Sequence, residues 1–119
     1  MAINLSTLVN QTNPLQLAKV WASFGVAYSG TTLVINSAYN VSSIVRNATG
    51  TYTINFTTPF TTTTYAMVGS VTYRFYSTFG ADDVAVSSQV LNTTSLQVYT
   101  THNATLYDCE QVNIAIFGN

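Results

Sequence analysis

Apolar and polar residues alternate with a period of two along most of this chain, and this pattern constrains the fold more than any other feature. It is clearest in residues 51–56, where Tyr52, Ile54 and Phe56 alternate with threonine and asparagine. Successive side chains of a β-strand point to opposite faces, so the pattern predicts strands with one buried and one solvated face. The segments that we expect to be strands are 19–24, 33–35, 41–46, 51–56, 65–76, 84–90, 95–101 and 111–117.

Turn-forming residues separate these segments. Asn47-Ala48-Thr49-Gly50 predicts a hairpin turn because glycine tolerates a positive φ, and Asn92-Thr93-Thr94 predicts another turn. Gly25 is expected to end the first strand, and no helix of useful length is predicted after residue 18. Many short strands are typical of sandwiches and barrels. We therefore expect an all-β fold, an antiparallel β-sandwich of jelly-roll type. In the last strand we expect Val112, Ile114 and Ile116 to point inward, and in the first strand Val20, Ala22 and Phe24 alternate with Lys19, Trp21 and Ser23.

Residues 1–18 differ from the rest, because the period of two dominates only from Lys19 onward and because residues 1–18 carry no charged side chain. One short helical turn fits the spacing of their first leucines, and Pro14 limits its length. The segment is too apolar for a solvated tail and too short to bury itself. We expect an arm (residues 1–18) that docks on a neighbouring subunit, followed by a sandwich domain over residues 19–119; the alternative is an arm that folds back on its own domain. The apolar residues of the arm are Leu5, Leu8, Val9, Leu15 and Leu17.

Charged residues make up only 6% of the 119 residues, against about 25% in ordinary soluble domains. The three Lys and Arg residues cannot neutralise many phosphates, which excludes a basic nucleic-acid binder and a polybasic membrane patch. No apolar run approaches the ~18 residues that span a bilayer. A surface so poor in charge is weakly protected against self-association. We therefore expect much of it to be packed in a homo-oligomer or a larger assembly, without nucleic-acid or membrane partners.

Catalytic and metal-binding chemistry has little support. His102, Asp108, Cys109 and Glu110 fall close together, but their spacing matches no structural zinc site. We expect a polar connection between strands with a buried thiol at the single cysteine. Asp82-Asp83 follow a glycine and are expected to form an exposed turn rather than a calcium site. The sequence therefore predicts a protein that is not an enzyme and has no metal site and no cofactor.

Two aromatic features are candidates for interface or glycan contacts. Tyr73-Arg74-Phe75-Tyr76 places aromatic rings around an arginine, a combination that often carries binding energy. The alternative is ordinary strand alternation. Trp21 is the only tryptophan, for which core packing is the default. The alternative is a subunit contact, since Lys19, Trp21 and Ser23 share the strand face opposite Val20 and Phe24. The candidate contact residues are Trp21, Tyr73, Arg74 and Tyr76.

Three segments carry a family resemblance: 19–24, 39–59 and 112–118. The middle one combines Asn-Val-Ser-Ser-Ile, a glycine turn and Tyr-Thr-Ile-Asn-Phe-Thr-Thr-Pro. Together they resemble a β-domain of bacteriophage virion surface proteins, found at the ends of tail fibres and as small free-standing proteins. The family often has acidic residues around the glycine turn, where this chain has Val45, Arg46 and Thr51, and an acidic loop where this chain has residues 61–64. These departures remove surface charge and favour a subunit packed into an assembly.

The resemblance implies a structural protein on the virion surface, with no catalytic residues to carry over. A chain of this length leaves no room for a fibre shaft. We expect a capsid decoration, or cement, protein that binds the major capsid protein from outside the head, as a homo-oligomer with a trimer favoured. The alternative is a tail-fibre or vertex module that binds a host receptor or surface glycan through exposed aromatics, among them Tyr99.

Overall fold

The structure is a computed structural model, and it describes residues 17–27, 30–72 and 84–119. In these ranges the chain forms nine strands and no helix, which confirms the all-β prediction. No helix of the described part is long and apolar enough to cross a membrane. The strands are β1 (Ala18–Val26), β2 (Leu33–Tyr39), β3 (Val41–Ala48), β4 (Thr51–Phe56), β5 (Ala66–Thr72), β6 (Val84–Val90), β7 (Ser95–His102), β8 (Thr105–Leu106) and β9 (Gln111–Phe117).

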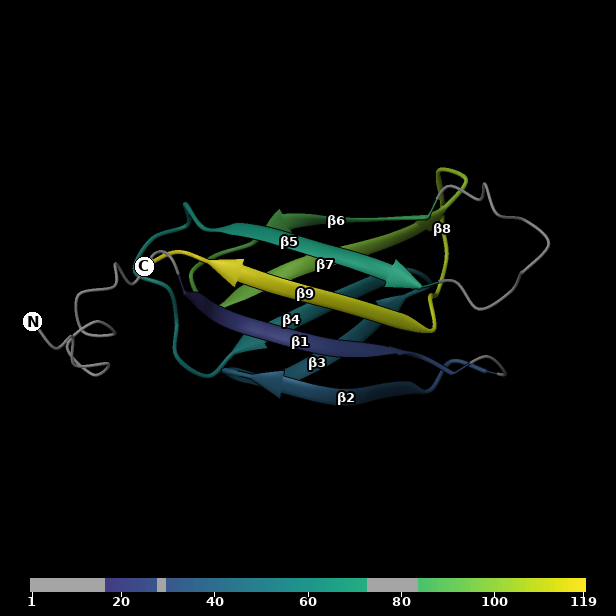
Figure 1. The fold of residues 1–119 in the computed structure, drawn as a ribbon, viewed down its shortest axis with the longest axis horizontal. Helices are drawn as coiled ribbons and strands as arrows, with labels where there is room; N and C mark the ends of the chain where they lie inside the picture. The colour runs from purple at the N-terminus through teal and green to yellow at the C-terminus, as the bar shows by residue number, and fades with distance from the viewer. Residues whose placement is uncertain (1–16, 28–29, 73–83) are drawn as a thin grey trace, which may run out of the picture.

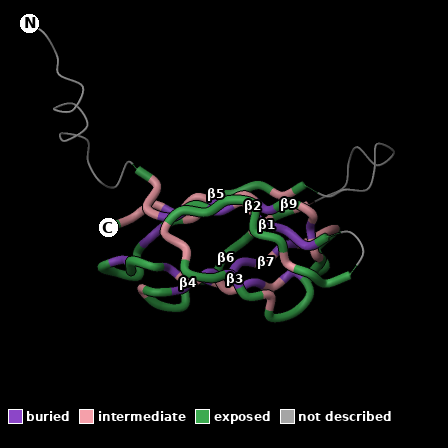
Figure 2. Tube along the Cα trace, turned by 90° about the horizontal axis from the view of Figure 1, so that it is seen from below, coloured by how far each residue is buried: buried purple, intermediate pink, exposed green. Residues whose placement is uncertain are grey.

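The strands form two antiparallel sheets. The first sheet has the order β2-β1-β9-β5, and the second has the order β3-β4-β7-β6, with the short β8 paired to β7. The sheets lie one over the other (Figures 1 and 2). The start of β1 and the C-terminus lie at the same end of the sandwich (Figure 1), where Ala18 pairs with Phe117. The expected pair of antiparallel sheets is therefore present, whereas the jelly-roll topology is not confirmed.

The hydrophobic core lies between the two sheets, and the period of two in the sequence selects its residues. In β4 the three apolar positions, Tyr52, Ile54 and Phe56, are buried, and the alternating threonines and asparagine are half-buried. The three inward residues expected from the last strand, Val112, Ile114 and Ile116, are buried as well, and in the first strand the buried face is that of Val20, Ala22 and Phe24. Rings from the two sheets meet edge to face, with the centroids of Phe24 and Tyr52 5.3 Å apart. Alternation thus predicted the buried face of these strands correctly.

The first strand departs from the expectation at two points. It does not end at Gly25 but continues to Val26, whose amide donates to the carbonyl of Cys109 (3.0 Å). The missing side chain of Gly25 permits close approach of another segment, because a Cβ atom there would collide with the Glu110 carbonyl. The expected core packing of Trp21 is also wrong: its side chain is 40% exposed and lies on the face opposite Val20 and Ala22.

The alternation predicts that Lys19 shares a face with Trp21 and Ser23, but the structure shows that it does not. The pairing of β1 with β9 shifts register between Ala18 and Val20, so Lys19 lies in a β-bulge. Its ammonium donates to the Pro59 carbonyl (2.8 Å) and lies 5.0 Å from the centroid of the Phe60 ring. The bulge therefore turns the lysine towards the segment that follows β4.

The predicted turns are confirmed. Gly50, between β3 and β4, has φ +65°, and a Cβ there would lie 2.6 Å from the Thr100 carbonyl oxygen. Asn92 shapes the turn before β7, because its Oδ1 accepts hydrogen bonds from the amide and hydroxyl of Thr94 (2.8 and 2.7 Å). The sequence did not indicate the β7–β8 hairpin, which turns through Asn103 and Ala104 at φ +50° and +65°.

Several sequence predictions lie outside the described residues. These are most of the arm, including Leu5, Leu8, Val9 and Leu15, and the second half of the expected strand 65–76 with Tyr73, Arg74, Phe75 and Tyr76. The expected turn at Asp82-Asp83 also lies outside them. Leu17 is described, and its side chain is 56% exposed beside the start of β1.

Candidate interaction surface

The outer face of the first sheet carries a row of apolar side chains that crosses all four strands. Trp21 of β1 pairs with Tyr39 of β2 on one side and with Ala115 of β9 on the other, and Ala115 pairs with Val68 of β5. Paired residues of neighbouring strands point to the same face. We call Tyr39, Trp21, Ala115 and Val68 the apolar row. Tyr39 and Val68, at its two ends, are 57% and 58% exposed.

The residues beside the apolar row are uncharged. On one side the next register positions are serine and asparagine, with Ser23 paired to Ser37 and to Asn113, and Asn113 paired to Ser70. On the other side Phe117 pairs with Ala66. Lys19 is the only charged residue in the four strands, and its ammonium is turned towards Pro59. The outer face of the first sheet therefore presents apolar surface with no charge to oppose association.

The outer face of the second sheet has a different character. Its side chains are mainly Thr, Ser, Asn and Gln, and they form hydrogen bonds with one another. Asn55 donates to the Ser43 hydroxyl (2.9 Å), and Thr53 donates to the side-chain oxygen of Asn47 (2.7 Å). The hydroxyl of Tyr99 lies 2.9 Å from the side-chain oxygens of Gln89 and of Gln97. This face is polar without charge and suits contact with water, so the apolar row distinguishes the first sheet.

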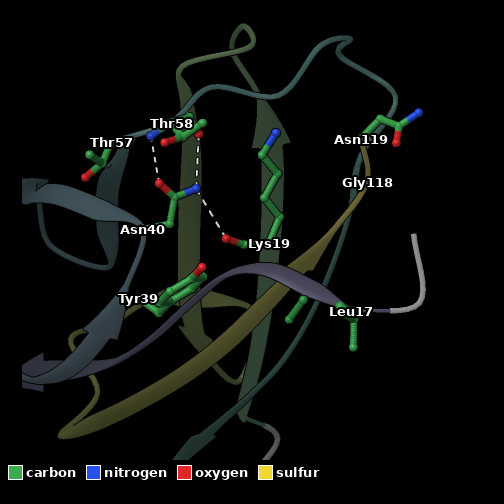
Figure 3. A pocket seen from close by; sticks show the side chains of 9 residues that line it. Leu17, Lys19, Tyr39, Asn40, Thr57, Thr58, Gly118 and Asn119 are labelled. Atoms are coloured by element: carbon green, nitrogen blue, oxygen red, sulfur yellow. Dashed lines mark hydrogen bonds between the residues drawn. The ribbon is translucent and has the colours of Figure 1, made fainter. Parts of the chain in front are cut away.

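A groove of about 650 Å³ opens beside the apolar row, at the end of the sandwich where β1 starts (Figure 3). Tyr39 belongs both to its lining and to the apolar row. The other lining residues are Leu17, Ala18, Lys19, Asn40, Thr57, Thr58, Gly118 and Asn119. The groove therefore extends the exposed surface of the first sheet towards the point where the arm joins the domain.

The polar groups of the groove are largely engaged within the protein. Asn40 connects β2 to β3 with φ +57°, and its amide nitrogen donates to the carbonyls of Lys19 (3.2 Å) and Thr58 (3.0 Å). Its amide oxygen accepts from the backbone amide of Thr58 (2.7 Å), as Figure 3 shows. These bonds hold the two sheets together at this end. They also leave Asn40 little capacity to bind a ligand.

The charged groups at the ends of β3 and β8 form a structural network. Arg46 donates to both carboxylate oxygens of Asp108, with Nη2 2.7 Å from Oδ2. Asp108 Oδ1 also accepts from the Tyr52 hydroxyl (2.7 Å) and from the backbone amide of Gly50 (2.9 Å). The carboxylate thus ties the β3–β4 hairpin to the segment before β9. Sequence reasoning missed this pairing; its only signal was the scarcity of opposite charges in the chain.

This network shifts three pKa values. Partial burial opposes the charged carboxylate of Asp108, but the hydrogen bonds from Arg46, Gly50 and Tyr52 outweigh that effect and lower its pKa. The hydrogen bond to Asp108 raises the pKa of Arg46. Burial, with the neighbouring Asp108 carboxylate, raises the pKa of Tyr52 well above its ordinary value. The arrangement therefore keeps Asp108 charged and Tyr52 protonated.

Three of the four candidates of the sequence cluster, His102, Asp108 and Cys109, have separate surroundings. Cys109 is a free and fully buried thiol whose pKa is raised by burial, as expected for a structural cysteine. His102 packs edge to face on Tyr107, with centroids 5.7 Å apart, whereas Asp108 faces Arg46. No group of three or more His, Cys, Asp or Glu side chains in the described ranges is placed to hold a metal ion. Every buried side-chain nitrogen and oxygen there has a hydrogen-bond partner.

Of the sequence-predicted contact residues, the structure places Trp21 on an exposed face. It adds three residues that sequence reasoning did not select, namely Tyr39, Val68 and Ala115, because they come from different strands and meet only through strand pairing. Comparison of the chain with protein-family models, with curated proteins and with solved structures finds no match.

Proposed function

We propose that this protein is a non-enzymatic structural subunit of a bacteriophage virion, most simply a capsid decoration protein that binds the major capsid protein from outside. The apolar row is the observation that carries the proposal. Apolar residues scattered singly over a surface are ordinary, but a contiguous apolar patch marks an interaction site. The resemblance of the strand motifs to phage virion surface domains supports the choice of assembly. The proposal requires two stacked sheets, whichever way they connect, so it does not depend on jelly-roll topology.

The proposed mechanism is stabilisation by mass action. A subunit that binds only the assembled lattice adds its binding free energy to that of the lattice. The few described charges are compatible with such packing, because Arg46 and Asp108 are paired and Lys19 is hydrogen bonded. A homo-oligomer, with a trimer favoured, would engage several lattice positions at once and gain avidity.

The test is the copy number of the protein in purified virions, measured by quantitative mass spectrometry against the major capsid protein. A copy number on the scale of the capsid protein is expected for a decoration protein. A small fraction of that number would place the protein on a tail or vertex and contradict the decoration role. Absence from virions would contradict the whole proposal.

A second function, a receptor- or glycan-binding module of a tail fibre or vertex, is favoured by one observation. Tyr39 is exposed beside the groove together with the hydroxyl side chains of Thr57 and Thr58, and aromatic rings near hydroxyls suit sugar binding. The experiment that separates the two functions is adsorption of the isolated protein to host cells. A fibre tip blocks infection in that assay, whereas a decoration protein leaves infection unchanged.

A further inference from the structure

We propose that the arm of one copy of this chain lies on the apolar row of a second copy, so that arm exchange holds the homo-oligomer together. The inference deepens the proposed function and rests on it, because it names the surface through which copies associate. Three features support it: the size of the exposed face, the reach of the arm and the character of both surfaces.

The size of the face argues against two copies that simply stack their first sheets. The outer strands and β9 have seven residues each. Four strands at a spacing of about 4.8 Å and a rise of about 3.4 Å per residue give a face of about 450 Å². A stable interface buries about 800 Å² on each partner. The flat outline of the face is well short of this accessible area, so a further segment that joins the contact brings the interface towards the size of a stable one.

The arm has the length to supply that contact. Residues 1–16 precede the described part of the chain, which starts at Leu17 beside the groove. Sixteen extended residues reach roughly 55 Å, whereas the four strands of the first sheet span only about 14 Å between the axes of their outer strands. An arm that leaves one copy at Leu17 can therefore reach and cross the apolar row of a neighbour.

The arm also matches the surface in character. It has no charged side chain, and the strands of the first sheet have only Lys19, which is turned away. Odd-numbered positions of the arm include Ile3, Leu5 and Val9, while most even-numbered positions are polar. An extended segment with this pattern has one apolar side. That side fits a row of exposed apolar residues and leaves its polar side to water.

Docking on a second copy, rather than on the arm's own domain, follows from the charge deficit. An arm folded back on its own domain would leave a monomer whose surface is still almost uncharged, a condition that promotes association. Exchange between copies buries the apolar row and the arm together. Because both surfaces are uncharged, no charged group has to leave water when they meet.

The experiment uses the full-length chain and two matched pairs of variants. Val68→Glu places a charge in the apolar row, and its control Val45→Glu places one at an exposed valine, 45% accessible, on the outer face of the second sheet. The double variant Leu5→Glu with Val9→Glu charges the apolar side of the extended arm, and its control, Ser6→Glu with Asn10→Glu, places two charges on the polar side. Analytical ultracentrifugation measures association, circular dichroism checks folding, and the emission of Trp21 reports whether the apolar row is covered.

The wild-type chain is expected to associate, and its Trp21 emission should be shifted to the blue relative to that of the weakened variants. Val68→Glu and the arm double variant should each weaken association at least tenfold, and both controls should leave it unchanged. A mixture of the two weakened variants should associate more strongly than either variant alone, because the intact arm of one then meets the intact row of the other in one of the two contacts of an exchanged pair.

Three results overturn the inference. A monomeric wild-type chain means that the arm lies on its own domain or elsewhere. Association that survives the arm variant means that sheets pack directly on each other. A mixture that associates no more strongly than either variant alone means that the arm does not lie on the apolar row. Copy number in virions is measured separately, so loss of the arm contact leaves the proposed function standing, and association of a protein absent from virions contradicts the function alone.

Discussion

The Arg46 guanidinium holds the Asp108 carboxylate across 62 residues of sequence, with Nη2 2.7 Å from Oδ2. The pair is partly buried, and the side chains are 19% and 17% exposed. Because Asp108 also accepts hydrogen bonds from Gly50 and Tyr52, one carboxylate joins the β3–β4 hairpin to the segment that leads into β9. The network therefore ties a hairpin of the second sheet to the segment that enters the first sheet, and its energetics can be measured.

Asp108→Asn should destabilise the protein by about 2–3 kcal/mol at neutral pH, because hydrogen bonds to a charged group contribute more than neutral ones. The folded state lowers the pKa of Asp108, so its contribution is present above the unfolded pKa and is lost as the pH falls through the folded pKa. Urea unfolding from pH 7 to pH 2 should therefore show a gap between wild type and variant that narrows below about pH 4. A constant gap over this range would contradict the charged role of Asp108.

Tyr52→Phe tests the same network at high pH. The variant loses the donor to Asp108 and should be less stable at neutral pH by about 1.5 kcal/mol. Since the pKa of Tyr52 is raised in the folded state, the tyrosine's contribution is complete below its unfolded pKa, near 10, and is lost as the pH rises towards the folded pKa. The stability difference should shrink above about pH 10. Denaturation curves at pH 8 to 11 measure it, and an unchanged difference would mean that Tyr52 ionises normally in the fold.

Ala104→Gly should stabilise the protein. Asn103 and Ala104 both have positive φ in the two-residue turn between β7 and β8, a conformation for which Asn-Gly is preferred. Removing the Cβ of Ala104 relieves strain of about 1 kcal/mol, partly offset by the entropy of glycine in the unfolded chain. Thermal unfolding measures the gain in stability.

Gly50→Ala is the opposite case. It should lower the free energy of unfolding by more than about 1 kcal/mol, since φ is +65° and a Cβ atom would collide with the Thr100 carbonyl. A stabilised Gly50→Ala would show that the turn relaxes freely.

The β7–β8 hairpin also shows where the sequence signal fails. Its turn reads Asn-Ala, which lacks the glycine that normally indicates such a turn, and β8 has only two residues. By contrast, buried apolar residues alternate strictly with more exposed residues in β4 and β9. A shift of the register by one residue would expose every core side chain of these strands, so the pattern specifies them well. The face predicted for Lys19 was wrong because a β-bulge adds one residue to the strand at this point. A periodic pattern in the sequence does not reveal such an insertion.

The candidate interaction surface was less accessible to sequence reasoning than the core. Trp21, Val68 and Ala115 belong to strands far apart in the chain, and only the strand order brings them into one row. Strand order depends on non-local pairing, which periodicity does not specify. Low charge predicted that some surface is covered, but both sheets are poor in charge. The difference between their outer faces became visible only when the paired residues were known.

Removal of residues 1–17 should leave a folded domain that no longer binds virus particles, because without the arm the copies do not form the oligomer that engages several lattice positions at once. The core residues identified in the described ranges run from Val20 to Ile116, so the truncated chain keeps the burial that these residues provide between the two sheets. Leu17 is exposed, and its loss removes little packing. Circular dichroism and the urea midpoint check the fold, and co-sedimentation with particles that lack the protein checks binding, with the full-length chain as the control. If the truncated domain binds particles with full affinity, the arm has no role in attachment, and the outer face of the first sheet must contact the lattice directly.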